Sequence, residues 1–228
     1  MEPRDKIIKL VVANTASGTE VLNVHQGVLC KSSGFFKRAM RPEWLDLRES
    51  PDTIELPDDP LNTVSDYIRW LYTATMPLKL YRMRDEDTRE KIAEESEKVF
   101  ILLAQAYVFG EKIIDAKYKN TVVKSVLEAK ESAGWNMGPE SVTIVYNGTP
   151  SGSPLRRLIA DNIARLAYDD SDKGIGWMSF FDGCPKEALV DAMKATVRTR
   201  AMVGHEINRN VKLLETYFED EQESDNFT

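Results

Sequence analysis

The residues of this chain best suited to nucleophilic or metal chemistry are its two histidines, His25 and His205, and its two cysteines, Cys30 and Cys184. A structural zinc site takes four such ligands, so one site would need all of them, and no two stand at the spacing of a ligand pair. The sequence therefore predicts no metal site. One disulfide is arithmetically open, but a chain with 42% hydrophobic residues can build a core without it, which favours free thiols in a reducing compartment.

His25 and Cys30 are the candidates for catalysis. A catalytic histidine needs an orienting carboxylate and a nucleophile nearby, whereas a core or capping histidine needs only a backbone partner. His25 stands where a predicted strand passes into a helix, and both interpretations are open there. Cys30 follows Val28 and Leu29 in an apolar helix, which indicates a buried, inert thiol.

The glycines and paired acids offer no further chemistry. The glycines form neither of the phosphate-binding patterns Gly-x-Gly-x-x-Gly and Gly-x-x-x-x-Gly-Lys-Ser/Thr, and the two within residues 174–177 are interpreted as a flexible connection. Acidic pairs at 58–59, 94–95 and 169–170 fall at expected helix ends or polar faces, where capping and solvation account for them. We therefore predict no catalytic residue, no cofactor and no enzyme activity.

The charge and hydropathy of the chain limit the classes of partner that we expect. The formal net charge is −7 and the pI is near 5.1, so the surface repels phosphate backbones and we expect no nucleic-acid binding. The first residues lack the apolar segment of a signal peptide, and no apolar run approaches the roughly 20 residues of a membrane span. These features predict a soluble intracellular protein of the cytoplasm or nucleus, neither secreted nor bound to a membrane.

Apolar spacing in the first part of the chain predicts a small sheet covered by helices. The expected elements begin with a β-hairpin over 6–25, whose turn is at 14–19, and a helical turn at 26–30. A second helix follows, capped by Ser32 or Ser33 and ended by Pro42, and then a charged loop over 42–52 and a strand over 53–57. The next helix is capped by the acids at 58–59 and ends near Ala74, and a short strand covers 77–81. The charged stretch 85–96 opens another helix, which Gly110 interrupts, and the next helix ends near Gly134.

The second half is expected to be helical. Residues 142–146 have strand propensity, yet Pro139 and Glu140 resemble a helix opening, so a helix over 139–150 is the preferred interpretation. Further helices begin at 153–154 and at 185, a last helix covers 205–221, and the acidic tail from about residue 219 is predicted to be disordered. The predicted fold class is therefore α+β, with an all-helical C-terminal region.

Four strings occur in order in the first part of the chain: VHQGVLC at 24–30, SGFF at 33–36, IELPDD at 54–59 and YIRWLYT at 67–73. Together with the order of elements, they resemble the BTB/POZ family in its filamentous-fungal form. Later, AYVFGEK at 106–112 resembles the helix that closes such a domain. VYNGTP at 145–150, followed by Leu155 and Arg156, resembles the C-terminal extension of the fungal members.

The resemblance implies a BTB/POZ domain over residues 1–130 and a helical C-terminal extension packed on it over residues 131–228. It favours a core or capping role for His25, and it implies that the family-motif residues are mainly structural. These residues are Val24, His25, Leu29, Cys30, Ser33, Phe35, Phe36, Trp70, Leu71 and Tyr72.

The chain departs from the family pattern in three places, one of which is a hairpin turn longer than usual. Ala74 stands where the family has glycine, which predicts a less tight turn. Members that dimerise and recruit transcriptional co-repressors carry an acidic residue entering the first strand and a basic one after the Val-His pair. Here Gln26 takes the second position, and the first falls on Asp5, Lys6 or Ile7, which argues against a co-repressor pocket.

The charged loop contains a hydrophobic-x-Glu triplet, Leu47-Arg48-Glu49. In family members that serve cullin ubiquitin ligases, a similar triplet inserts into the cullin, where an apolar anchor beside a charge gives a pocket contact and an orientation. Leu47 could equally cover the core beside Trp44. The candidate partner-binding residues are Trp44, Leu47 and Glu49.

We therefore expect a protein–protein interaction module that works as a scaffold or by homo- or hetero-association, with a homodimer as one form. One alternative is a substrate adaptor of a cullin-type E3 ubiquitin ligase, with the cullin as partner. The lack of a separate substrate-reading domain such as kelch repeats weakens that alternative. The other alternative is a transcription-associated regulator without its own DNA-binding domain.

Overall fold

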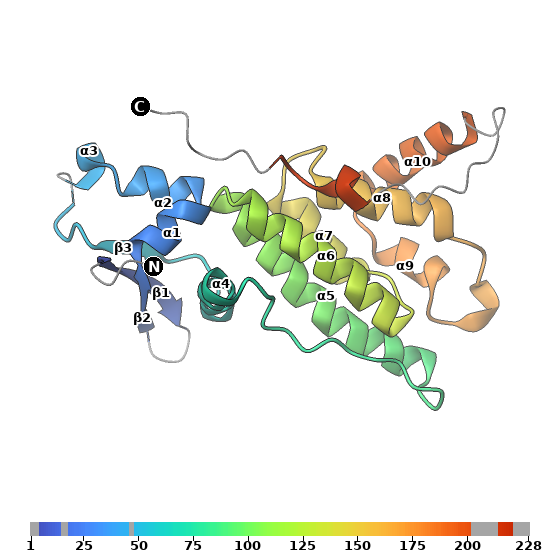
Figure 1. The fold of residues 1–228 in the computed structure, drawn as a ribbon. Coiled ribbons are helices and arrows are strands. Elements are labelled where there is room, and N and C mark those ends of the chain that lie inside the picture. The colour runs from blue at the N-terminus through green and yellow to red at the C-terminus, as the bar shows by residue number, and fades with distance from the viewer. Residues whose placement is uncertain (1–4, 15–17, 46–47, 202–213, 221–228) are drawn as a thin grey trace. The chain divides into compact units, whose positions relative to one another are not determined.

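The computed structural model describes residues 5–14, 18–45, 48–201 and 214–220. It separates into two compact units (Figure 1). Unit 1 contains Met1–Pro77, Phe109–Val122 and Asp220–Thr228, and unit 2 contains Leu78–Val108 and Val123–Glu219. Each unit is assembled from separated stretches of sequence, whereas the prediction divided the chain once, at residue 130.

Unit 1 is built on a three-stranded mixed sheet in the order β2-β1-β3. Strand β1 (Ile7–Asn14) pairs antiparallel with β2 (Gly18–His25), and β3 (Thr53–Leu56) pairs parallel with β1. The predicted hairpin and the strand near residue 53 are confirmed, and so is the α+β class. The predicted turn is shorter than expected because Gly18 and Thr19 belong to β2; residues 15–17 lie outside the described ranges.

One face of this sheet forms the core of unit 1. Ile8, Leu10 and Val12 alternate along β1 and are fully buried, and Ile54 and Leu56 of β3 extend the same layer. Alternation with a period of two places their neighbours on the opposite face. The sheet is therefore buried on one side, with α1 and α4 packed against its strands (Figure 1).

Short helices follow the hairpin: α1 (Gln26–Ser32), α2 (Gly34–Ala39) and α3 (Pro42–Leu45). The predicted cap is confirmed for Ser33, whose hydroxyl accepts a hydrogen bond of 3.1 Å from the Phe36 N–H. The prediction that Pro42 ends the second helix was wrong. That helix ends at Ala39, and Pro42 instead begins α3, because proline is tolerated in a first helical turn.

Helix α4 (Leu61–Thr73) has the predicted length but not the predicted cap. No side chain caps its N-terminus, and the Asp59 carboxylate pairs instead with Lys112, Oδ2 to Nζ 2.7 Å. The helix ends where expected. Ala74 has a φ of 55°, the left-handed conformation that glycine adopts most readily, so the alanine does not prevent a tight turn.

Two long helices, α5 (Arg89–Lys112) and α6 (Ala116–Ala133), contribute residues to both units. The prediction that Gly110 interrupts the first of them was wrong, since α5 runs through it. A Cβ at Gly110 would lie 2.8 Å from Cγ of Lys119, so this glycine permits a close side-chain approach. The α5–α6 turn contains Ile114, whose φ of 57° is rare for a β-branched residue.

The predicted strand at 77–81 was wrong, because this segment pairs with no strand in the described part of the chain. Its polar groups bond to the end of α6: the Tyr81 carbonyl accepts from the Ser132 hydroxyl (2.7 Å), and the Met83 N–H donates to the Ser132 carbonyl (3.1 Å). Those bonds replace a sheet ladder.

The rest of unit 2 is helical. Its elements are α7 (Pro139–Gly148), α8 (Pro154–Leu166), the 3₁₀ turn η1 (Ser171–Lys173), α9 (Trp177–Gly183), α10 (Lys186–Ala201) and the 3₁₀ turn η3 (Leu214–Tyr217). The helical interpretation of residues 139–150 is confirmed, whereas α9 was not predicted. Of the predicted last helix, only residues 214–220 are described, and they contain a 3₁₀ turn instead. His205 and the tail beyond residue 220 lie outside the described residues.

A buried arginine joins α7 to α8. Arg156 is 4% exposed, and its guanidinium donates to the Tyr146 carbonyl and to both oxygens of Thr149. It also lies over the Tyr146 ring and pairs with Glu187 at 2.8 Å. The strings at 145–150 and 155–156 therefore work as one structural unit, in which Arg156 satisfies carbonyls that the end of α7 leaves free.

Candidate functional site

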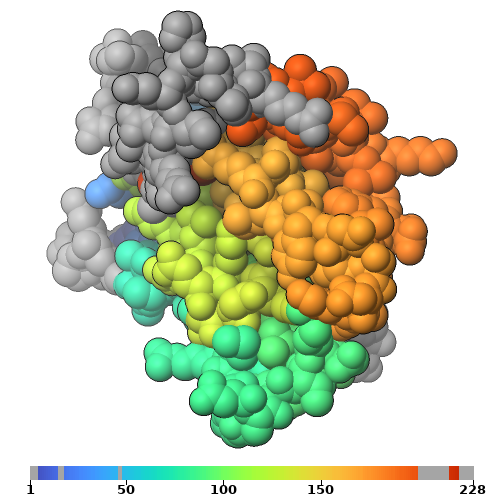
Figure 2. All heavy atoms as spheres, turned by 90° about the vertical axis from the view of Figure 1, so that its right-hand side faces the viewer, coloured from blue at the N-terminus to red at the C-terminus, as the bar shows by residue number. Residues whose placement is uncertain are grey.

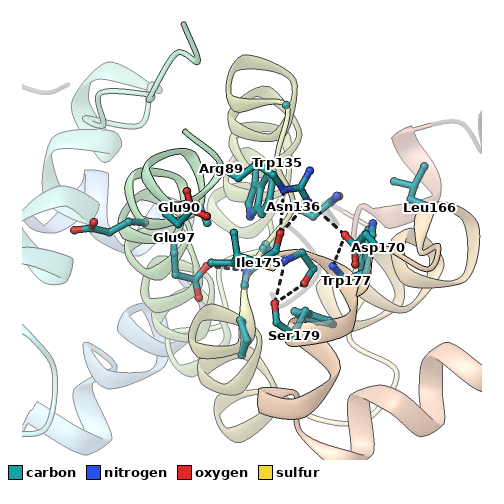
Figure 3. A pocket seen from close by; sticks show the side chains of 18 of the residues that line it. Arg89, Glu90, Glu97, Trp135, Asn136, Leu166, Asp170, Ile175, Trp177 and Ser179 are labelled. Atoms are coloured by element: carbon teal, nitrogen blue, oxygen red, sulfur yellow. Dashed lines mark hydrogen bonds and ion pairs between the residues drawn. The ribbon is translucent and has the colours of Figure 1, made fainter. Parts of the chain in front are cut away.

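Unit 2 contains a pocket of about 1010 Å³. Three segments line it: the first turns of α5, the end of α6 with the connection to α7, and the stretch from Leu166 to Phe180. Figure 2 shows the face of unit 2 where these segments meet, with α5 in green, α6 in yellow-green and the third segment in orange. Figure 3 shows the side chains that point into the space between them.

Arg89 of α5 links two of the walls (Figure 3). Its Nε and Nη2 donate to the Ile175 carbonyl at 3.1 and 2.9 Å, and Nη2 lies 3.3 Å from Oδ2 of Asp170. The guanidinium also lies 5.1 Å from the centre of the Trp135 ring. The connection at 174–177, interpreted from sequence as flexible, is therefore anchored by a charged side chain.

Asp170 holds the same connection from the other side. Its carboxylate accepts hydrogen bonds of 3.0 Å from the N–H groups of both Trp177 and Met178, which are free donors at the start of α9. The Met178 N–H, assisted by that of Trp177 and by the Arg89 charge, lowers the pKa of Asp170. A Cβ at Gly176 would lie 2.0 Å from Oδ2 of Asp170, so only glycine permits this approach.

Glu97 performs a similar task at the start of α7. It accepts hydrogen bonds of 2.7 Å from the N–H groups of Gly138 and Ser141, and one of 2.9 Å from the Ser141 hydroxyl. A Cβ at Gly138 would lie 2.7 Å from this carboxylate. Two carboxylates that line the pocket are thus committed to helix caps, which fixes the shape of its walls.

The interior of the pocket is mainly aromatic and apolar, with two polar groups. Trp135, Trp177 and Phe180 form its aromatic lining. Lys130 is half-buried and donates to Oδ1 of Asn162 at 3.0 Å, and burial lowers the pKa of its ammonium group. Oδ1 of Asn136 is buried and has no hydrogen-bond partner within the described residues.

The mouth of the pocket is acidic. Glu90, Glu94 and Glu131 are exposed lining residues, and only Glu94 has an ion-pair partner among the described residues, Lys98 at 2.9 Å. An apolar interior with few polar groups and a charged mouth is suited to binding. The sequence signal for this site was the pair Asp169-Asp170 ahead of two glycines and a tryptophan, which we interpreted as solvation and flexibility.

The family-motif residues lie elsewhere, in unit 1, and half of them are buried there. Val24, Leu29, Ser33, Phe36 and Trp70 are buried. Phe35 and Leu71 are half-buried, whereas Tyr72 is exposed. A mainly structural role stays a prediction for these residues.

His25 and Cys30 have no catalytic partners among the residues that they contact in the structure. The Nδ1 atom of His25 lies 2.7 Å from the Tyr72 hydroxyl, which also accepts from the His25 backbone N–H. Cys30 is half-buried rather than buried, and its thiol contacts the Phe36 carbonyl. Burial, with the nearby Asp5 carboxylate, raises the pKa of Cys30 to about 11, so the reactive thiolate is disfavoured at neutral pH.

The predicted partner-binding residues are only partly described. Trp44 of α3 is 58% exposed, and Glu49 is also exposed. Leu47 lies outside the described residues. Trp44 therefore does not cover the core of unit 1 and presents a large aromatic surface to solvent.

Sequence reasoning missed a buried carboxylate in unit 1. Asp115 is fully buried, and it accepts hydrogen bonds from the hydroxyls of Ser32 (2.6 Å) and Tyr67 (2.8 Å) and from the Tyr118 N–H (2.9 Å). Burial is the main cause that raises its pKa. This cluster connects α1, α4 and the start of α6.

Comparisons with known proteins leave the family open: no protein-family model matches the chain, and no curated protein matches it. In the described part of the chain, no group of three or more histidine, cysteine or acidic side chains is placed to hold a metal ion. None of the helices described is both long and apolar enough to cross a bilayer.

Proposed function

We propose that the chain is a protein-association module of the BTB/POZ type and that unit 1 associates with a second copy of itself. The observation that supports this proposal is the exposed apolar surface of the hairpin: Ile7 is 42% exposed and Val21 is 50% exposed. The strings within residues 24–73 that resemble the family also support it.

These side chains share one face of the sheet. Val21 is directly opposite Val11 in the register, and Ile7 is opposite His25, so all four lie on the face that does not form the core. Strand β2 is also an edge strand, paired on one side only within the described residues. An edge with free N–H and carbonyl groups beside exposed apolar side chains is suited to pairing with another chain.

Size-exclusion chromatography with light scattering tests this proposal on the full chain. We expect a dimer that dissociates on dilution, and the double substitution Ile7→Lys with Val21→Lys should shift it to monomer. The matched control is Met193→Lys with Val197→Lys, which adds the same charge at exposed apolar positions of α10. A wild-type chain that stays monomeric at every concentration would contradict self-association.

The exposure of Trp44 favours a second candidate, a substrate adaptor of a cullin-type ubiquitin ligase. An exposed aromatic residue next to an acidic one is a typical anchor for a protein partner. Affinity purification with mass spectrometry compares wild type with Trp44→Ala and with Leu47→Ala plus Glu49→Ala. A cullin that is captured by wild type and lost in the variants supports the adaptor, and a wild-type sample without cullin counts against it.

A further inference from the structure

We infer that the pocket of unit 2 binds a short peptide segment of a partner protein, in which an apolar side chain stands next to a basic one. This site is separate from the hairpin surface of unit 1 and does not depend on self-association. The inference combines three properties of the lining: an aromatic interior, a half-buried ammonium group with hydrogens left to donate, and an acidic mouth.

The interior selects for an apolar anchor. Trp135, Trp177 and Phe180 offer ring faces and edges in a space of about 1010 Å³, at the upper end of the volumes that ordinary ligand pockets have. The capping bonds of Glu97 and Asp170 hold the surrounding backbone in place. A preformed apolar space of this size can accept a large side chain together with part of the main chain that carries it.

One polar group of the interior matches a peptide backbone. Lys130 directs one bond to Asn162, and an ammonium group has three hydrogens to donate. A peptide carbonyl can accept one of the remaining hydrogens.

The charges favour a basic neighbour over an acidic one. Five carboxylates and two basic groups line the pocket, and the guanidinium of Arg89 is already held by Asp170 and Ile175. Glu90 and Glu131 at the mouth have no ion-pair partner among the described residues. A lysine or arginine next to the anchor would meet these carboxylates, whereas a phosphate or an acidic peptide would be repelled.

Selection from a phage-displayed library of random octapeptides tests the inference with the full chain as target. Enriched peptides should carry lysine or arginine beside a large apolar residue. Their affinity, measured by fluorescence anisotropy, should fall by about tenfold or more in the double substitution Glu90→Lys with Glu131→Lys. The matched control is Glu43→Lys with Glu128→Lys, which makes the same change of charge at exposed positions outside the pocket lining and should leave the affinity unchanged.

A second variant tests the polar contact. Lys130→Met should weaken the selected peptides about threefold to tenfold, the effect of one lost hydrogen bond. Circular dichroism must show that each variant is folded. The inference is overturned if the folded wild type enriches no peptide, if the enriched peptides lack a basic residue, or if both double substitutions weaken binding equally. A small cation such as arginine amide that binds as tightly as the peptides would also overturn it.

Discussion

Each unit buries an aspartate almost completely, Asp115 in unit 1 and Asp170 in unit 2, and the pKa values of these two carboxyl groups shift in opposite directions. Around Asp115 the donors are two hydroxyl groups and one backbone N–H. Removing the ionised carboxylate from water costs more free energy than these hydrogen bonds supply, so the pKa of Asp115 is raised. Around Asp170 the donors are two backbone N–H groups at a helix start and a guanidinium, and the pKa is lowered.

The difference shows that burial alone does not decide the protonation of a carboxylate. A neutral hydroxyl donates one hydrogen bond, whereas a helix N-terminus and an arginine also bring positive charge. Unit 2 also places opposite charge beside the buried guanidinium of Arg156, which pairs with Glu187 and donates hydrogen bonds to carbonyls at the end of α7. Unit 2 thus compensates Asp170 and Arg156 with opposite charge, and unit 1 does the same for Asp59 through Lys112. Asp115 differs because its hydrogen-bond donors are all uncharged.

The largest effect is expected when that compensation is broken at Arg156. The substitution Arg156→Ala leaves the carbonyls of Tyr146 and Thr149 without their donor and should lower the free energy of unfolding by about 3 to 5 kcal/mol. Urea denaturation followed by circular dichroism measures this loss.

Two companion variants separate the guanidinium from the ion pair. Glu187 is 55% exposed, so Glu187→Ala should cost less than about 1 kcal/mol. Arg156→Lys keeps the charge but not the forked donors, and should recover only part of the loss. Equal losses in the alanine variants at positions 156 and 187 would show that the ion pair dominates.

The next effect concerns the approach of backbone to Asp170. Gly176→Ala introduces a methyl group into the space of a fixed carboxylate and should destabilise unit 2 by about 1 to 3 kcal/mol. Because Trp177 is the next residue, its fluorescence should change as well. Ser179→Ala, which removes only an exposed hydroxyl that bonds to Gly176, should change both measurements much less.

The sequence was sufficient for the elements whose signals are local. The hairpin, α1, the Ser33 cap and the helical choice for α7 follow from apolar spacing and capping residues that lie within a few positions of one another. The errors arose where a distant partner overrides a local preference. Asp59 resembles a helix cap but pairs with Lys112, and Gly110 resembles a helix end but makes room for Lys119.

The pocket could not be predicted for the same reason. Arg89 and Ile175 are 86 positions apart, and nothing in either local sequence indicates that a guanidinium and a carbonyl will meet. Asp170 was classed with solvated acids, although the glycine six residues later is the only residue type that lets its carboxylate reach the start of α9. Long-range contacts of this kind require coordinates.

The opposite pKa shifts predict opposite pH dependences. Asp170 has a lowered pKa, so its contribution to stability is present above the ordinary aspartate pKa and is lost as the pH falls toward its folded value. Asp115 has a raised pKa, so wild type loses stability as the pH rises through that folded value. Melting temperatures of wild type, Asp170→Asn and Asp115→Asn between pH 3 and pH 8 test this.

The difference in melting temperature between wild type and variant should grow with rising pH for Asp170→Asn and shrink with rising pH for Asp115→Asn. Comparing each variant with wild type at the same pH cancels the titration of all other groups. If both differences changed with pH in the same direction, the environments of Asp115 and Asp170 would not differ in the way that their contacts indicate.

The smallest effect concerns helix ends, where the units also differ. Unit 1 places Ala74 in the left-handed region after α4, with a φ of 55°, and unit 2 places Gly134 there after α6, with a φ of 61°. A Cβ is unfavourable in this conformation, so Ala74→Gly should stabilise the chain by about 0.5 to 1 kcal/mol and Gly134→Ala should destabilise it by about 1 kcal/mol. Differential scanning calorimetry resolves changes of this size. A loss of stability in Ala74→Gly would mean that the alanine methyl makes contacts worth more than the backbone strain, and the two helix ends would then differ in packing rather than in conformational cost.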